Sequence, residues 1–219
     1  LADEDEKESK LSEEQKNNTT YLKSKYVNFD NGLVEQIVEK QRTGERSFKP
    51  SSVYKILPPI DILGAFCYGI GPFDIGKPDG DGVFRNIPVA TEEKYNSTGY
   101  FPPLSLLVYL NAGNLSMDKN VYYAIKKQEV NIYRDAAKKE GLIVSIPVDK
   151  NGVWNLNYYG KKPFKYYSFV DIVEGKTKEE LKNKIVMVGF TETAKALYDL
   201  RALPFDPNAA GVEIHATAI

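Results

Sequence analysis

The run Asp79-Gly80-Asp81-Gly82 is the part of the sequence that most resembles a cation site. A calcium loop alternates oxygen ligands along the chain and closes with a bidentate glutamate. Lys77 stands where that pattern needs an upstream oxygen ligand, and no glutamate stands at the required place downstream. The Asp-Gly pairs instead favour a hairpin turn, because glycine adopts the positive φ that such turns need. We expect Asp81 and Arg85 to form an ion pair that fixes this turn.

The single cysteine and the single histidine exclude several other kinds of chemistry. Cys67 and His215 are too few for a Cys/His zinc cluster, and one cysteine forms no internal disulfide. Cys67 lies in an apolar run, which is typical of a buried, inert thiol. A Ser-His-Asp triad would have to use His215, and the sequence contains no Gly-x-Ser-x-Gly turn. We therefore expect no metal and no cofactor, a structural role for His215, and no catalytic residue.

Three residues are the best candidates for bordering a ligand pocket. Trp154 and Tyr158 belong to an aromatic group that could form a ligand platform, although such residues more often pack in a core. Thr191 follows Gly189 at the end of the apolar run 184–189. Ligands of α/β proteins bind outside the carboxyl ends of parallel strands. No nucleotide-binding glycine motif follows the run, so we expect Trp154, Tyr158 and Thr191 to border a pocket of another kind.

These residues must be positioned by strands, turns and helices that alternate along the chain. The hydrophobic patterns and the Asp-Gly and Asn-Gly pairs predict two antiparallel hairpins. One pairs 63–70 with 83–90, and the other pairs 142–148 with 153–158. Helices are predicted over 31–41, 104–110, 168–173 and 177–183. The last stretch, 211–219, is predicted to begin as a strand-like run and to pass into a helix over 216–219.

The run 184–189, Lys-Ile-Val-Met-Val-Gly, differs from the other predicted strands because its apolar residues do not alternate with polar ones. Continuous hydrophobicity is typical of a parallel strand that is covered on both faces. The predicted fold class is therefore α/β, with a mixed sheet that combines antiparallel hairpins and at least one buried parallel strand, flanked by helices.

The composition indicates one globular domain behind an acidic segment. Of the 219 residues, 42% are hydrophobic and 12% aromatic, enough for a core. Residues 1–20 are rich in Asp and Glu and poor in apolar side chains, so we expect a mobile leader followed by a single domain over 21–219. The formal net charge of −1 provides no basic surplus for nucleic acid. No apolar run is long enough to span a membrane, and the start at Leu1 suggests a piece of a longer protein.

Several short motifs occur in an order and spacing that resemble a known family over about two thirds of the chain. They are Asp79-Gly80-Asp81-Gly82-Val83 with Arg85, Ser105-Leu106 after a proline pair, Trp154 with Asn157-Tyr158 and Gly160, Tyr167-Ser168-Phe169-Val170-Asp171, Leu181 with the run 184–189, and Asp199, Pro204 and Gly211-Val212-Glu213-Ile214-His215-Ala216. The chain resembles the type-two CHASE domain, a sensory module of membrane receptors. The family's N-terminal strand and helix have no counterpart before Leu1, so we expect this domain to be incomplete at its N-terminal side, or that strand to be supplied by another piece.

The resemblance implies an extracytoplasmic sensor, periplasmic or extracellular, in a bacterial receptor that regulates an adenylate or guanylate cyclase or a kinase. The domain itself would not be an enzyme, would bind a small-molecule or peptide ligand, would be anchored by spans outside this chain, and could pair as a homodimer in the receptor. Residues that the motifs mark as structural are Asp79, Asp81, Gly82, Arg85, Ser168, Asp171, Gly189, Glu213 and His215. A surface hydrolase with a carboxylate pair and a non-catalytic interaction module remain as alternatives.

Overall fold

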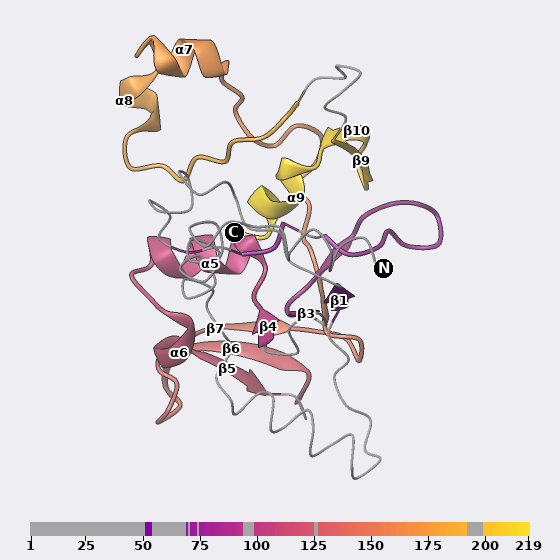
Figure 1. Cartoon of the computed structure of the whole chain (residues 1–219), viewed down its shortest axis with the longest axis vertical. Helices are drawn as coiled ribbons and strands as arrows, with labels where there is room; N and C mark the ends of the chain where they lie inside the picture. The colour runs from indigo at the N-terminus through magenta and orange to yellow at the C-terminus, as the bar shows by residue number, and fades with distance from the viewer. Residues whose placement is uncertain are drawn as a thin grey trace, which may run out of the picture.

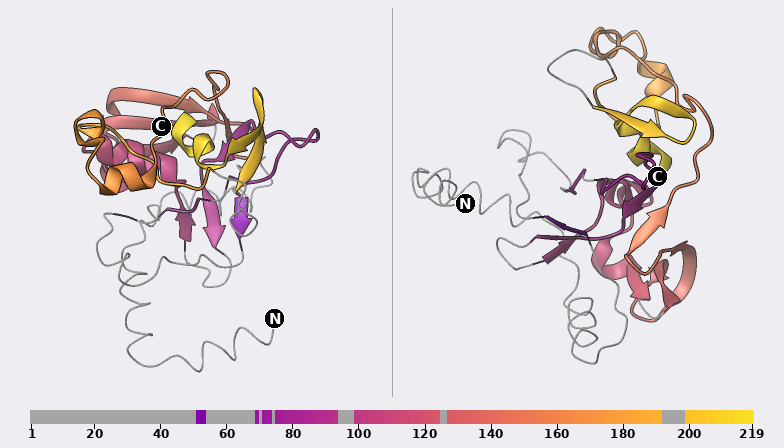
Figure 2. Two further views of the ribbon diagram at one scale, coloured as in Figure 1. Left: turned by 90° about the horizontal axis from the view of Figure 1, so that it is seen from above. Right: turned by 90° about the vertical axis from the view of Figure 1, so that its right-hand side faces the viewer.

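The computed structural model describes residues 51–53, 69, 71–73, 75–93, 99–124, 127–191 and 199–219. Within these residues the chain forms a mixed α/β structure with four small sheets and short helices (Figure 1). The segment 121–147 lies at one end of the molecule and the segment 169–181 at the other, with the C-terminus between them (Figure 2). No helix in the described part of the chain is long and apolar enough to cross a membrane.

The largest sheet is an antiparallel meander of Val121–Ala124 (β5), Glu129–Asp135 (β6) and Glu140–Pro147 (β7). A bulge interrupts the β6–β7 register between Ile132 and Tyr133. The helices Leu104–Ala112 (α5) and Met117–Asn120 (α6) precede this sheet in the chain.

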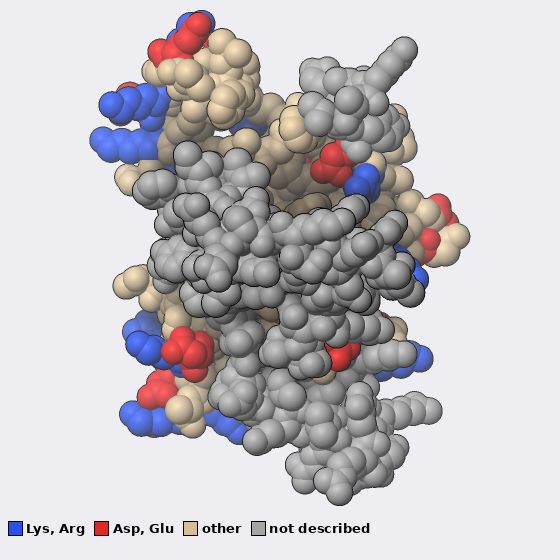
Figure 3. Space-filling model, viewed as in Figure 1, with Lys and Arg blue, Asp and Glu red and all other residues tan. Residues whose placement is uncertain are grey.

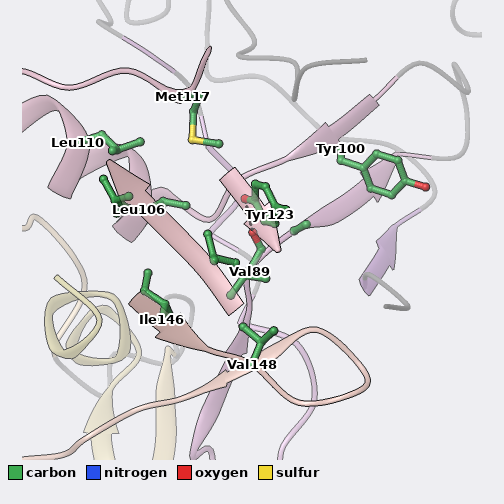
Figure 4. Packing of buried hydrophobic residues seen from close by; sticks show 11 residues of the cluster. Val89, Tyr100, Leu106, Leu110, Met117, Tyr123, Ile146 and Val148 are labelled. Atoms are coloured by element: carbon green, nitrogen blue, oxygen red, sulfur yellow. Dashed lines mark hydrogen bonds between the residues drawn. The ribbon is translucent and has the colours of Figure 1, made fainter. Parts of the chain in front are cut away.

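The first hydrophobic core forms between α5 and this sheet (Figure 4). Leu106 and Leu110 of α5 meet Ile146 of β7 and Val89 in the same cluster. The hydroxyl of the buried Tyr123 donates to the Val89 carbonyl at 3.2 Å. The core therefore satisfies this polar atom while it buries the ring.

A second sheet combines the two strand orientations. Thr91–Glu93 (β3) lies between Ser51–Val53 (β1) and Gly99–Phe101 (β4). Strand β1 is parallel to β3, and β4 is antiparallel to it.

Two similar turns lead into a third, two-stranded sheet. In the turns Asp79–Val83 and Asp149–Val153, the first residue's N–H donates to the last residue's carbonyl at 3.0 Å. The glycines of the two turns, Gly82 and Gly152, have φ of 82° and 73°, which only glycine adopts without strain. The strands that follow, Asn86–Pro88 (β2) and Val153–Asn155 (β8), pair with each other antiparallel.

The C-terminal part contains a long excursion and a compact hairpin with its helix. The excursion over 157–190 carries Phe169–Val173 (α7) and Lys178–Leu181 (α8). Leu200–Leu203 (β9) and Asp206–Ala210 (β10) form the hairpin, and Val212–Thr217 (α9) follows it directly. In Figure 1, α9 lies between this hairpin and α5, and α5 and α9 are in contact.

A second hydrophobic core joins α9 to strands β2, β9 and β10. Its buried members are Ile87, Leu203, Ala209, Ile214 and Ala218. Trp154 of β8 packs against both this core and the first one. The β2–β8 sheet therefore connects the two halves of the described structure.

Several predicted elements are confirmed. The helix predicted over 104–110 is α5, and the N–H of Gly113 at its end donates to the Tyr109 carbonyl at 3.0 Å. The helices predicted over 168–173 and 177–183 appear as α7 and the shorter α8. The last predicted helix starts too late, because α9 begins at Val212 and the run before His215, which was expected to be strand-like, is helical. A short apolar run has no periodicity that separates a strand from a buried helix. The predicted helix 31–41, Cys67 and the leader 1–20 lie outside the described residues.

The second predicted hairpin is wrong in its pairing. The Asn-Gly turn forms as expected, but β7 pairs with β6 and β8 pairs with β2. The turn sequence specifies a local reversal of the chain, whereas the partner of each strand depends on residues far away in the sequence. In the first predicted hairpin the arm 63–70 falls outside the described residues except for Gly69, and β2 within 83–90 pairs with β8.

The predicted buried strand 184–189 is also wrong. These residues have no regular secondary structure, and Ile185, Val186 and Val188 are exposed, the last at 75%. Among the described residues no strand pairs with the run, and parallel pairing occurs only between β1 and β3. Met187, Val188 and Gly189 instead line a cavity beside α9, so a cavity wall accounts for their apolar character.

Candidate functional site

A cavity of about 720 Å³ lies beside the N-terminal end of α9. Its wall contains Phe73 and residues within 75–84, the first residue of α5, the segment 187–190, residues 199–202 around β9, and the start of α9. Its volume falls in the range of about 300–1,000 Å³ that is typical of small-molecule sites. Five separate stretches of the chain therefore converge on one hollow.

The lining of the cavity is mostly apolar, with one pair of opposite charges. Phe73 and Phe84 are among the apolar lining residues, and Asp199, Arg201 and His215 are the ionisable ones. A guanidinium nitrogen of Arg201 lies 3.0 Å from a carboxylate oxygen of Asp199, and another donates to the Leu200 carbonyl at 3.0 Å. The pair leaves the cavity with little net charge, so it suits a ligand with an apolar body and a small polar group.

His215 connects α9 to the loop on the other side of the cavity. The residue is buried on α9, and its Nε2 lies 3.1 Å from the carbonyl oxygen of Phe73. This hydrogen bond spans 142 residues of sequence. A structural role for His215, which the sequence suggested, agrees with this contact.

Two glycines allow the start of α9 to pack closely against the cavity wall. A Cβ added at Gly189 would lie 2.7 Å from Cβ of Val212, and one added at Gly211 would lie 2.6 Å from Oδ2 of Asp199. The N–H of Gly211 also donates to the carbonyl of Asp199 at 2.8 Å. Any larger residue at these positions would have to displace α9 or its neighbours.

The opposite side of α9 carries a buried polar cluster. The hydroxyl of Tyr166 donates to Oε1 of Glu213, a residue only 6% exposed. The buried Asp206 of β10 lies 3.8 Å from the ammonium of Lys161. Burial, the hydrogen bond to Glu213 and the nearby carboxylates raise the pKa of Tyr166. The cluster thereby attaches the segment 158–166 to α9 and β10.

Tyr158 lies next to this cluster without a hydrogen bond. Its hydroxyl oxygen is buried and has no partner in the described structure. Burial and the charge of Glu213 raise the pKa of Tyr158 to about 12. Tyr158 and Tyr166 therefore differ in one respect, because only Tyr166 donates to the carboxylate.

The Asp-Gly turn lies at the edge of the cavity and is clamped by Arg85. The guanidinium of Arg85 makes two hydrogen bonds to the Asp81 carboxylate, at 2.7 and 2.9 Å, and a third to Asp79 at 2.8 Å. The hydrogen bonds from Arg85 and from the Val83 N–H lower the pKa of Asp81 to about 2. Gly82 of this turn lines the cavity, and the Phe84 N–H donates to the Ala202 carbonyl at 2.8 Å.

The structure brings some of the predicted residues together and separates others. Gly82, Gly189 and His215 line the cavity, and Glu213 lies on the other side of the same helix. Ser168 and Asp171 belong to the α7 region of the excursion. Ser168 is the N-cap residue of α7 but makes no side-chain capping bond, and Asp171 lies 3.2 Å from the ammonium of Lys176.

The three residues expected to border a pocket do not line this cavity. Trp154 and Tyr158 pack against the second hydrophobic core. Thr191 is exposed and follows Phe190, which is itself a lining residue. Trp154 and Tyr158 thus pack against the core that holds α9, and Thr191 follows a lining residue. None of the three is part of the cavity wall.

Sequence reasoning assigned no site role to Asp199, Arg201 or Tyr166. Asp199 is one of the residues that match the family series, but nothing marked it as part of a site. No motif contains Arg201, which stands two residues further on, the spacing that puts two side chains on one face of a strand. Tyr166 was part of the aromatic group, with nothing to distinguish it from its neighbours. Among the described residues no cluster of three or more His, Cys, Asp or Glu side chains could hold a metal ion.

Comparison with known protein families identifies a match. The CHASE2 domain matches residues 3–219, nearly the whole chain. No curated protein and no solved structure matches it. The family is one of sensory extracellular domains, so the domain is a sensor rather than a catalyst, with an extracytoplasmic location. The chain belongs to the CHASE2 domain family.

Proposed function

We propose that this chain is the ligand-binding sensor of a membrane-anchored receptor and that it controls an adenylate or guanylate cyclase. The observation that carries the proposal is the cavity beside α9, which is built from five separate stretches of the chain. A cavity of this size with an apolar wall and few polar groups has the properties of a small-molecule site.

The position of α9 suggests how binding is transmitted. Val212 and His215 line the cavity, while Glu213 on the same helix is held by Tyr166. A ligand that contacts the cavity wall more favourably in one position of α9 shifts the population toward that position. Displacement of α9 relative to Tyr166 is then the structural change that transmits the signal to the rest of the receptor.

The lining also indicates the class of ligand. The apolar wall favours an aliphatic or aromatic body, and the Arg201–Asp199 pair can bind a group that both donates and accepts hydrogen bonds. We expect an uncharged or zwitterionic molecule, since a single ionic group would have to compete with the existing ion pair.

The test combines thermal unfolding of the domain with cyclase output of the receptor that contains it. The probes are apolar amino acids, which are zwitterions, and short-chain aliphatic amides, which are uncharged. Ala202→Phe places a ring in the cavity, whereas Ala112→Phe adds the same ring at an exposed helix end as a control. We expect at least one probe to raise the melting temperature and change cyclase output in the parent and the control, but not in Ala202→Phe. If the two variants respond alike, or no probe acts, the cavity is not the sensory site.

A further inference from the structure

The helix α7 exposes an apolar face at the end of the molecule farthest from the β5-β6-β7 sheet (Figures 1 and 2). Phe169, Val170 and Val173 are 66%, 60% and 71% exposed, and no residue of α7 is buried. Positions three and four residues apart lie on one side of a helix. These three side chains therefore form one exposed apolar face.

The excursion that carries α7 is basic, unlike the rest of the chain. Residues 159–190 contain seven lysines and four acidic residues, a net charge of +3, whereas the whole chain has a net charge of −1. Charged side chains gather on the α7–α8 end of the molecule in the space-filling view (Figure 3). The remainder of the chain therefore has a net charge of −4, and the excess of positive charge lies in the segment that carries the apolar face.

Part of this positive charge is available to a partner. Lys176 pairs with Asp171 and Glu174, and Lys165 pairs with Glu180. The lysines that follow are different: Lys178, Lys182 and Lys184 are exposed, and the structure contains no ion pair between them and any described residue. Three ammonium groups thus lie in or directly after α8 with no intramolecular carboxylate partner in the part of the chain that the structure describes.

We propose that the α7–α8 excursion docks onto the surface of an anionic phospholipid bilayer. Phe169, Val170 and Val173 enter the boundary between headgroups and acyl chains, while Lys178, Lys182 and Lys184 contact lipid phosphates. Exposed apolar side chains surrounded by lysines are the combination by which peripheral helices bind membranes. Charge complementarity selects a lipid surface, because a purely apolar partner would leave the three ammonium groups unpaired. The contact would restrict how the sensor stands on the membrane, and it is independent of what the cavity binds.

The test is co-sedimentation of the 219-residue chain with vesicles. Vesicles of phosphatidylglycerol and phosphatidylcholine are compared with vesicles of phosphatidylcholine alone, at low and high salt. We expect binding only to the anionic vesicles, and weaker binding at high salt because exposed charges are screened. Binding of equal strength to both kinds of vesicle would overturn the proposal, as would no binding to either.

Two sets of variants assign the binding to this surface. Replacing Lys178, Lys182 and Lys184 by Gln should weaken binding about a hundredfold, because each lysine near an anionic surface contributes about fivefold. Phe169→Ser with Val173→Ser should weaken it at least about tenfold by removing buried apolar area. These side chains are exposed, so the variants should unfold at the same urea concentration as the parent.

The control variant removes the same charge elsewhere. Lys138, Lys139 and Lys150 are exposed residues in turns outside the excursion, and replacing all three by Gln should change binding less than about threefold. Equal losses in the control and test variants would show non-specific attraction and overturn the proposal. It would also be wrong if the apolar variant abolished self-association of the chain in sedimentation velocity while vesicle binding stayed unchanged.

Discussion

Removing one hydroxyl from Tyr166 or from Tyr158 should change stability in opposite directions. Both rings lie beside Glu213, but only the Tyr166 hydroxyl donates a hydrogen bond to it. Tyr158 buries its hydroxyl oxygen without a partner in the described structure. Tyr→Phe is therefore the same chemical change in two neighbouring places with different hydrogen bonding.

The magnitudes follow from these contacts. A hydrogen bond to a charged group contributes about 1.5–3 kcal/mol. Tyr166 is 43% exposed, so water can partly replace its hydroxyl, and Tyr166→Phe should lower the free energy of unfolding by about 1.5 kcal/mol. A buried hydroxyl without a partner costs about 1–3 kcal/mol. Tyr158→Phe should therefore raise the free energy of unfolding by about 1 kcal/mol.

Urea unfolding followed by far-ultraviolet circular dichroism measures both effects. With a slope of about 2 kcal/mol per M, the midpoint should fall by about 0.7 M in Tyr166→Phe and rise by about 0.5 M in Tyr158→Phe. In a double-mutant cycle, Glu213→Gln should couple to Tyr166→Phe more strongly than to Tyr158→Phe.

The same residues predict an alkaline transition. The pKa of Tyr158 is raised to about 12 in the folded protein, so the unfolded chain releases this proton first. Stability should be complete below about pH 10, the ordinary tyrosine pKa, and fall as the pH rises toward 12. Tyr158→Phe should reduce that fall. Equal destabilisation by the two substitutions, or an alkaline fall that is unchanged in Tyr158→Phe, would refute the assignment of these hydrogen bonds.

Three further substitutions test other parts of the structure. Ile214→Ala should cost about 3 kcal/mol of unfolding free energy and Ile214→Val about 1, because the side chain is fully buried in the second core; similar midpoints for both would contradict that packing. Asn120→Asp should cost about 3 kcal/mol in the same assay, since the Asn120 amide donates to two backbone carbonyls at 2.9 Å, and an unchanged midpoint would exclude those bonds. The pKa of Asp81 is lowered to about 2, so its ion pair stabilises the fold above about pH 4 and is lost as the pH falls toward 2. Carboxyl NMR should show that pKa rising toward 4 in Arg85→Gln, whereas a pKa that stays near 2 would mean that Arg85 is not its cause.

Local features of this fold could be predicted from the sequence. Pro103 before α5 and Gly113 after it mark the ends of that helix, and the apolar residues between them bury one side. The Asp-Gly and Asn-Gly turns form where expected, because their geometry depends on neighbouring residues alone.

Neither the pairing of the strands nor the structure of the apolar run 184–189 could be predicted. Strand β8 could have continued the β7 hairpin, but it pairs with β2, about 65 residues earlier in the chain. The run 184–189 has the composition of a covered strand, yet it forms no strand: Ile185, Val186 and Val188 are exposed, and its last three residues line a cavity. Local hydrophobicity does not show which other segment packs on an apolar run.

Some residues of the candidate site could be identified from the sequence, and others could not. His215 and Glu213 could be identified because they belong to a family motif, and the structure shows them on two sides of α9. Asp199 and Arg201 pair with each other at a separation of two residues. Their place in a cavity wall, and the contact of Tyr166 with Glu213, depend on segments that are distant in the sequence, and no single-sequence pattern records such proximity.

Trp154 is the only tryptophan in the chain, and it packs against both hydrophobic cores. Intrinsic emission excited at 295 nm therefore comes from a single place, the junction between the sheet-bearing half and the half that contains α9. A displacement of one half relative to the other must change the packing around this indole. The native protein thus carries its own optical reporter of the movement that a sensor would need, with no label attached.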